Sequence, residues 1–394
     1  MEDPPPSATY DERSRWALRA GREGAAMVTY VRNVSERLRL RSSFYWLMVI
    51  LPTAGAILEV AAAYVATIAA HASVISLVAH EALWLVIGGL AFIVMQAVPL
   101  KVWLKLAPLF LLLAGAMLLA VMVPGVGRSV GGADRWFQLG PIQVQPSEFA
   151  KLALVLFLAQ LVAKRRPGQL VGPVIVVTAA MAGVIFLEPD MGTAMIVFSL
   201  GLGALYVGGV RGRALAFVTG GSVLAGVVGA FSSTYRRLRL LSFLHPWEYR
   251  MSYSYQEVQA LNSFASGHLL GTGLGTGLAN WGYVPNAQTD FIFAVVGQDF
   301  GLVGAVLILC LLVALAVVVF RLSELVTNPA ERALTFLIGV WLLVQTTLNI
   351  GAVIGMLPVT GVPLPLISAG GSSTVVTLAA LGLVSGIFRR RRIS

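Results

Sequence analysis

Asp290 is the residue in this sequence whose setting most favours acid–base chemistry. It follows the polar stretch Asn286–Thr289 and leads directly into the apolar run Phe291–Gly297. A carboxylate at the edge of an apolar segment is partly desolvated, which raises its pKa above the ordinary value of about 3.9 and makes it a stronger base. Asp is also a preferred N-cap residue, so the position by itself predicts a general base or a helix cap equally well.

Glu148 and Lys151 are a second candidate pair, because they lie at the start of the apolar segment 147–163. Residues three apart share one face of a helix and can form an ion pair. Two interpretations stay open. The pair could only allow an apolar helix to tolerate both charges, or the carboxylate could hold Lys151 near an anionic ligand.

Glu188 and Asp190 flank Pro189 between two further apolar segments. They form either an exposed turn between helices or a carboxylate pair at the mouth of a cavity, able to bind a cation or a proton.

Two segments are rich in residues that break helices. The glycines of Gly267–Gly277 permit a re-entrant backbone that approaches a ligand head group. Because no predicted strand precedes them, this segment is not the glycine-rich loop of a dinucleotide-binding fold. Pro358–Pro365, followed by Ser368 and Ser372, holds three prolines in eight residues and cannot continue a helix. We expect it to form an ordered turn.

The composition determines what must position these residues. Hydrophobic residues make up 57% of the 394-residue chain and charged residues 12%, against roughly 25% charged residues in soluble domains. This excludes a soluble enzyme. The single Cys310 excludes a disulfide framework, and the four histidines show no metal-ligand spacing. Ten apolar segments are long enough to span a membrane, and their approximate bounds are 44–66, 82–99, 104–123, 147–163, 170–187, 191–209, 213–231, 300–320, 333–356 and 368–388.

The distribution of Lys and Arg predicts the orientation. With both termini in the cytoplasm, 21 of these residues fall on the inner side and six on the outer side, as the positive-inside rule requires. The net charge of +10 therefore reflects membrane topology rather than nucleic-acid binding. We expect an all-α polytopic membrane protein with ten transmembrane helices, both termini cytoplasmic, and long outer-face loops with re-entrant segments.

Three domains follow from this topology. Residues 1–43 form a basic cytoplasmic tail, expected to be disordered, with a basic amphipathic helix over 29–41 as the alternative. Residues 44–388 form the membrane domain, including a large external loop at about 232–299. Residues 389–394 form a basic cytoplasmic C-terminus.

Five ordered motifs resemble the SEDS family of FtsW, RodA and SpoVE. They are Asp134–Trp136 with Leu139–Pro141, Gln145–Lys151, Glu188–Thr193, Thr289–Ala294, and Pro363–Ser373. The resemblance covers about residues 44–390, and the short join from Gly275 to Pro285 is more like FtsW than RodA. The sequence departs from the usual motifs of the family at four positions, which weakens any detailed inference about substrate positioning. These positions are Gln288, the pair Gln298 and Asp299, and Ala369.

The resemblance implies a peptidoglycan glycosyltransferase of septal cell-wall synthesis in the cytoplasmic membrane of a bacterium. Its substrates would be lipid II, a disaccharide pentapeptide on undecaprenyl pyrophosphate, and the growing glycan strand. Its partners would be a class B penicillin-binding protein transpeptidase, other divisome proteins and membrane lipid. Asp290 matches the essential aspartate of the family, and Arg135, Glu148 and Lys151 match its outer-cavity charges. Glu188, Ser368 and Ser372 lie in matched motifs and are candidate substrate-binding residues.

The chemistry of such a reaction fits these residues. Nucleotide sugars are absent outside the cell, so the donor must be lipid-linked, and its pyrophosphate leaving group needs cationic neutralisation rather than an acid. The acceptor hydroxyl needs a general base, for which Asp290 is the best candidate. No motif requires a metal, although a divalent cation (Mg or Mn) could bridge the pyrophosphate and a carboxylate. A lipid II flippase and a non-catalytic divisome scaffold remain as alternatives.

Overall fold

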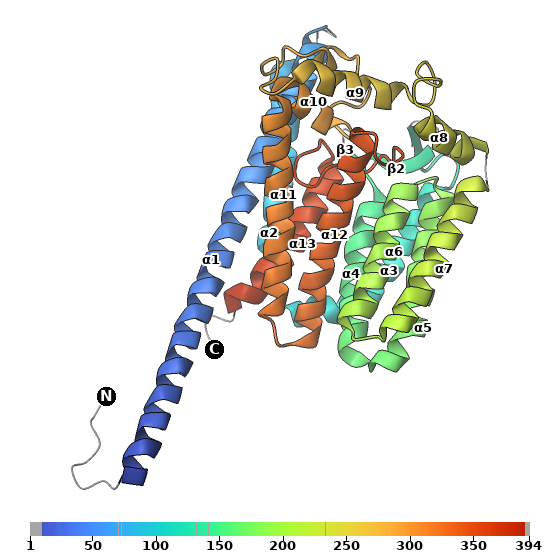
Figure 1. Ribbon diagram of the computed structural model, residues 1–394. Coiled ribbons are helices and arrows are strands. Elements are labelled where there is room, and N and C mark those ends of the chain that lie inside the picture. Colours follow the sequence, from blue (N-terminus) through green and yellow to red (C-terminus); the bar gives the residue numbers. More distant parts are fainter. Residues whose placement is uncertain are drawn as a thin grey trace. The chain divides into compact units, whose positions relative to one another are not determined.

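A computed structural model of the protein describes residues 10–69, 71, 73–130, 133–140, 142–232 and 234–390 (Figure 1). The chain divides into two compact units, Met1–Trp46 and Leu47–Ser394. Every candidate site residue belongs to the second unit. The early prolines of the expected N-terminal tail, and residues 391–394 of the expected C-terminal tail, lie outside the described residues.

The first helix is longer than the sequence analysis expects. Helix α1 (Tyr10–Ala69) already includes residues 10–43, for which a disordered tail was the preferred prediction. Ala, Arg, Glu and Leu are common in this stretch and no proline interrupts it, so its helix propensity is high. The alternative basic helix over 29–41 lies within α1.

The membrane-spanning segments agree well with the apolar pattern of the sequence. In the described part of the chain, nine helices are long and apolar enough to cross a membrane. They are the Ser35–Val65 part of α1, α2 (Val74–Ala97), α3 (Leu100–Val121), α4 (Pro146–Lys164), α5 (Pro167–Leu187), α7 (Gly212–Phe231), α11 (Gly301–Glu324), α12 (Pro329–Val353) and α13 (Gly371–Arg390). The tenth expected span is the shorter apolar helix α6 (Met191–Val207), whose length of about 26 Å falls just short of the hydrocarbon core of about 30 Å. The protein is an all-α polytopic membrane protein in architecture.

Two segments expected to be loops contain regular structure instead. The segment before α4 forms three short antiparallel strands in the order β1-β2-β3, namely β1 (Arg128–Val130), β2 (Ala133–Leu139) and β3 (Ile142–Val144). Gly140 has a positive φ of 61°, which lets the chain turn back after β2.

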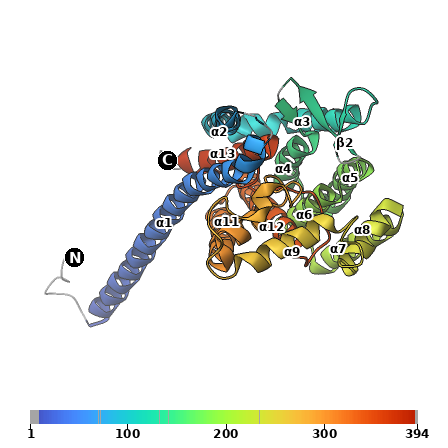
Figure 2. The same ribbon diagram turned by 90° about the horizontal axis from the view of Figure 1, so that it is seen from above.

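The expected external loop at 232–299 is also largely helical. It contains α8 (Thr234–Leu244), α9 (Tyr255–Gly267), the 3₁₀ helix η1 (Leu278–Trp281) and α10 (Ile292–Asp299). Figure 1 shows α8, α9, α10 and the strands together at one end of the helix bundle. Helix α9 lies across this end, in contact with α10, α11 and α12 (Figure 2).

The most buried spans are α4, α12 and α13. Helix α13 packs closely along α2 (Figure 2), because Gly382 and Gly386 bring the two backbones together. A Cβ at Gly382 would lie 2.5 Å from the Phe92 carbonyl oxygen, and one at Gly386 would lie 2.8 Å from that of Gln96. Small residues four apart are the usual means of such close packing in membranes. This packing positions the segment that precedes α13, which contributes to the candidate site.

Candidate active site

Asp290 lies immediately before α10 but does not cap it. The N-cap position is Phe291, which makes no side-chain capping hydrogen bond, so the helix-cap alternative is wrong. The Asp290 side chain is half-buried, and no described residue donates a hydrogen bond to its carboxylate. Its backbone carbonyl accepts a hydrogen bond of 2.8 Å from Asn349 Nδ2 on α12. The backbone is therefore held while the carboxylate stays available.

Positive and negative charges surround this carboxylate. A Cβ at Gly361 would lie 3.5 Å from Asp290 Oδ2 and 3.9 Å from Arg135 Nη1, so the Pro358–Pro365 loop passes close to both groups. The pKa of Asp290 is raised to about 6, chiefly by burial and then by the charge of Asp190, while Arg135 and Arg239 lower it. A carboxylate with a pKa of about 6 is a much better base than an exposed aspartate, and it is still mostly ionised at neutral pH.

Arg135 extends from β2 to the turn between α5 and α6. Its Nε donates to the Glu188 carbonyl oxygen at 2.8 Å, and its Nη2 donates to that of Pro189 at 2.5 Å. These bonds orient the guanidinium beside Asp290. The predicted cationic residue thus lies at the same site as the predicted base, although 155 positions separate them in the sequence.

The turn that holds Glu188 and Asp190 is buried, since the two residues are 3% and 2% exposed. The exposed-turn interpretation is therefore wrong. Asp190 caps α6, with its Oδ1 accepting from the Thr193 amide at 3.0 Å. Glu188 Oε1 is buried and has no hydrogen-bond partner among the described residues. The pKa of Glu188 is raised to about 8, chiefly by burial and then by the charge of Asp190, while Arg135 lowers it, so this carboxyl is mostly neutral at pH 7.

The predicted ion pair in α4 is confirmed. Lys151 Nζ lies 2.9 Å from Glu148 Oε1, donates to Gln345 Oε1 at 2.8 Å, and lies 4.9 Å from the centre of the Trp341 ring. Lys151 has no exposed surface. Gln345 Nε2 in turn donates to the Pro363 carbonyl oxygen at 2.8 Å. In this conformation Lys151 supports the loop beside Asp290 through Gln345, and its contact with an anionic ligand stays a prediction.

Ser368 and Ser372 are buried and bind the backbone. Ser368 Oγ accepts from the Leu364 amide at 2.7 Å, and Ser372 Oγ donates to the Gln143 carbonyl oxygen at 3.1 Å. Through Ser372 the start of α13 is joined to β3. The structure places both serines as supports of the site, and their binding to substrate stays a prediction.

The glycine-rich segment Gly267–Gly277 binds its own chain. The Gly275 amide donates to Asp299 Oδ2 at 2.9 Å, and the Gly273 amide donates to the Asp299 carbonyl oxygen at 3.0 Å. Gln298 accepts from the Ala279 amide at 2.7 Å through Oε1 and donates to Ser266 Oγ through Nε2. The side-chain amide of Gln298 thus satisfies a donor and an acceptor at once, which a carboxylate could not do. This explains one departure from the family pattern.

Sequence reasoning missed the role of Gln345 and Asn349. Both lie on α12, four residues apart, and both bind the Pro358–Pro365 loop, since Asn349 Nδ2 donates to the Val362 carbonyl oxygen at 2.8 Å as well as to that of Asp290. Two amide side chains one helical turn apart in an apolar segment were the available signal.

The structure is a bundle of apolar helices. At one end it brings together the half-buried Asp290 carboxylate, the buried Glu188 carboxyl and the Arg135 guanidinium. These features define a polytopic membrane protein with a cluster of charged groups at one end of its helix bundle. Comparison with known proteins gives the particular group. The chain belongs to the FtsW/RodA/SpoVE family of cell cycle proteins, whose family model matches residues 42–393.

Curated relatives and solved structures agree with this assignment. The chain is 39% identical over 320 residues to the probable peptidoglycan glycosyltransferase FtsW of Nitrosococcus halophilus, covering 77% of this chain and 81% of that protein. It is 33% identical over 359 residues to the protein of the same name from Mycobacterium tuberculosis, covering 89% and 68%. A chain from a peptidoglycan synthase complex, studied for its structural coordination of polymerization and crosslinking, matches with a TM-score of 0.71 and 29% identity over 89% of this chain and 98% of that one. The rod shape determining protein RodA of Thermus thermophilus matches with a TM-score of 0.65 and 27% identity over 88% and 96%.

Proposed function

We propose that this protein is a peptidoglycan glycosyltransferase that polymerises lipid II into glycan strands on the outer face of the cytoplasmic membrane, during septal cell-wall synthesis. The family and the names of the FtsW relatives support the activity. The observation that carries the chemistry is the half-buried Asp290 carboxylate, with a pKa raised to about 6, beside the Arg135 guanidinium.

Asp290 would act as the general base. The hydroxyl of the acceptor sugar is a poor nucleophile, and a carboxylate that takes its proton during attack accelerates such a step by about 10²–10⁴-fold. As the hydroxyl oxygen forms its bond to the anomeric carbon of the donor, the bond to the pyrophosphate oxygen breaks, and the proton passes to Asp290. A single displacement of this kind inverts the configuration at that carbon.

Arg135 and Arg239 would stabilise the departing pyrophosphate, since both exert a positive charge on the Asp290 environment. A leaving group that is already anionic needs neutralisation more than protonation. The raised pKa of Glu188 fits this arrangement, because a mostly neutral carboxyl at pH 7 does not repel the pyrophosphate. A divalent cation bridging the pyrophosphate and a carboxylate stays part of the proposal, and chelation during the polymerisation assay tests it.

The complex of a similar chain is a peptidoglycan synthase that polymerises and crosslinks. We infer by analogy that a class B penicillin-binding protein supplies the crosslinking transpeptidase, and that other divisome proteins bind nearby. The charge bias of the loops supports cytoplasmic termini, which would direct the Asp290 end of the bundle outward.

The decisive experiment compares the wild type with Asp290→Asn in liposomes that contain lipid II. The carboxamide has the same shape and the Asn349 bond to the backbone carbonyl remains, so the fold should survive while the base is lost. We expect polymerisation to fall by about 10²–10⁴-fold with an unchanged melting temperature. Glu324→Gln, a change at an exposed carboxylate on α11, is the matched control.

The same assay separates the alternatives. Lipid II that crosses the bilayer without polymer formation would favour a flippase, and neither outcome would favour a scaffold. Polymer made at a near wild-type rate by Asp290→Asn would remove the assignment of the base.

A further inference from the structure

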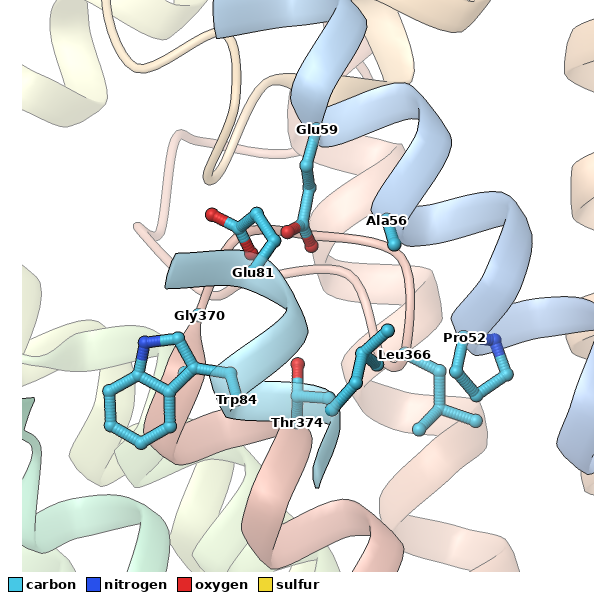
Figure 3. Close-up of a pocket in the computed structure, with 10 residues that line it drawn as sticks. Pro52, Ala56, Glu59, Glu81, Trp84, Leu366, Gly370 and Thr374 are labelled. Carbon is cyan, nitrogen blue, oxygen red and sulfur yellow. The ribbon is translucent and has the colours of Figure 1, made fainter. Parts of the chain in front are cut away.

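Two glutamates outside the candidate active site face each other between α1 and α2. Glu59 is 7% exposed and Glu81 is half-buried, and their carboxyl groups lie close enough to interact directly. Figure 3 shows the two carboxyl groups side by side. Ionisable residues in spanning helices are costly and call for a function, and the proposed reaction at Asp290 uses neither of these.

In the part of the chain that the structure describes, no positive charge balances the pair. Among the described residues, the only charged group that acts on Glu59 is Glu81, and neither glutamate forms an ion pair with an Arg, Lys or His. His80, the neighbour of Glu81, accepts a hydrogen bond from Trp84 Nε1 at 3.0 Å. Two ionised carboxylates this close in a desolvated setting repel each other strongly, so the pair needs a bound cation or protons.

A cavity beside the pair contains a further oxygen ligand. It is lined by both glutamates, Trp84, Gly370 and Thr374. Thr374 is 8% exposed, its hydroxyl has no hydrogen-bond partner among the described residues, and Figure 3 shows it directed toward the two carboxylates. A hydroxyl without a hydrogen-bond partner, on a largely buried residue and directed at two acidic groups, indicates a ligand that binds through oxygen atoms.

We propose that Glu59, Glu81 and Thr374 form a binding site for one divalent cation. A charge of +2 neutralises two carboxylates, whereas a monovalent ion or a single shared proton leaves one negative charge in an apolar setting. Carboxylate and hydroxyl oxygens are the ligands of hard cations such as Mg²⁺, Ca²⁺ and Mn²⁺, and water completes the coordination of such ions. The site is distinct from the proposed one at Asp290 and does not depend on the glycosyltransferase activity.

The position of the site gives it a structural role. Gly370 and Thr374 belong to the segment at the start of α13, and in the same segment the Ala369 amide donates to the Gln288 carbonyl oxygen at 2.8 Å, two residues before Asp290. A cation at this site therefore joins α1 and α2 to the segment that supports Asp290.

Binding of Mn²⁺ tests the proposal directly. The full-length protein is stripped with a chelator, and electron paramagnetic resonance then measures free Mn²⁺ at pH 7. We expect one Mn²⁺ per chain that Glu59→Gln and Glu81→Gln each abolish. Thr374→Val should weaken Mn²⁺ binding by about tenfold, because valine has nearly the shape of threonine but lacks the hydroxyl ligand. Asp290→Asn and Glu324→Gln, as controls, should retain this ion.

Thermal unfolding provides a second readout, since a ligand that binds only the folded state raises the melting temperature. Mn²⁺ should stabilise the wild type and leave the doubly substituted Glu59→Gln/Glu81→Gln protein unaffected. Three results would overturn the proposal: no bound Mn²⁺ in the wild type, an ion lost in Asp290→Asn but kept in Glu59→Gln, or a melting temperature that depends on pH but not on Mn²⁺. If a glutamate variant does not fold, Thr374→Val decides by itself, because unchanged Mn²⁺ affinity contradicts the site.

Discussion

Replacing Asp190 by Asn should make the enzyme more active at acid pH. Two effects raise the pKa of Asp290: burial is the larger, and the negative charge of Asp190 is the second. Asn is as good an N-cap as Asp, and its side-chain oxygen can still accept from the Thr193 amide. The substitution therefore removes a negative charge near the base while it keeps the start of α6 intact.

The expected size follows from the pKa of Asp290. Because burial is the larger cause and remains, the pKa should fall from about 6 by about one pH unit at most, which corresponds to about 1.4 kcal/mol. A base works in its deprotonated form, so activity declines as the pH falls through this pKa. At pH 5, a pKa of 6 leaves about one-eleventh of the carboxylates ionised and a pKa of 5 leaves about half, so the rate at pH 5 should rise by up to about fivefold.

The assay is the pH profile of kcat/KM for polymerisation of labelled lipid II, because this constant reports the ionisation of the free enzyme. The acid limb should move to lower pH in Asp190→Asn, and the melting temperature measured alongside should change little. An acid limb that stays in place, or moves to higher pH, would refute the electrostatic account of Asp290. Glu324→Gln is again the control, since its exposed carboxylate should leave the profile unchanged.

Three more predictions concern the support of the site and its orientation. Exchange of Glu148 and Lys151 should reduce both activity and melting temperature, because a carboxylate at 151 would face an aromatic ring and an amide oxygen; loss of activity with an unchanged melting temperature would instead indicate direct contact of Lys151 with the pyrophosphate. Asn349→Leu removes one buried and one partly buried hydrogen bond. It should cost about 2–4 kcal/mol of stability in denaturant unfolding, and a cost near zero would contradict the role of Asn349 in holding the loop. Single cysteines at Ser232 and Arg321, in a background without the native cysteine, should react with an impermeant reagent from opposite sides of the membrane, and labelling of Ser232 only after the membrane is opened would reverse the orientation.

Much of the architecture could be predicted because it depends on local composition. A spanning helix needs about 20 apolar residues whatever its neighbours are, so all ten apolar segments appear in the structure as helices. Most bounds agree with the expected ones to within four residues, but α2 begins eight residues earlier than expected, at Val74, and α1 begins far earlier, at Tyr10. The setting of Asp290 was also visible, since the change from a polar to an apolar stretch is a property of adjacent residues. The ion pair of Glu148 and Lys151 followed from their spacing on one helix.

The strands before α4 and the helices α8 and α9 were less visible, because they are short and amphipathic and are stabilised by packing on the end of the bundle. Helix length and apolar content predict nothing about such segments. The same holds for the caps, since Asp190 and Asp290 both precede a helix and only Asp190 caps one.

By itself, then, the sequence determined the membrane helices, the charge bias and the candidate status of Asp290, each of which depends on residues close together in the chain. Only the tertiary structure decided which charges meet. It brings Arg135 to the Glu188 carbonyl, Asn349 to that of Asp290, and Glu59 to Glu81. These contacts join different helices and strands, and their geometry depends on how the elements pack, for which a linear pattern of apolar residues contains no information.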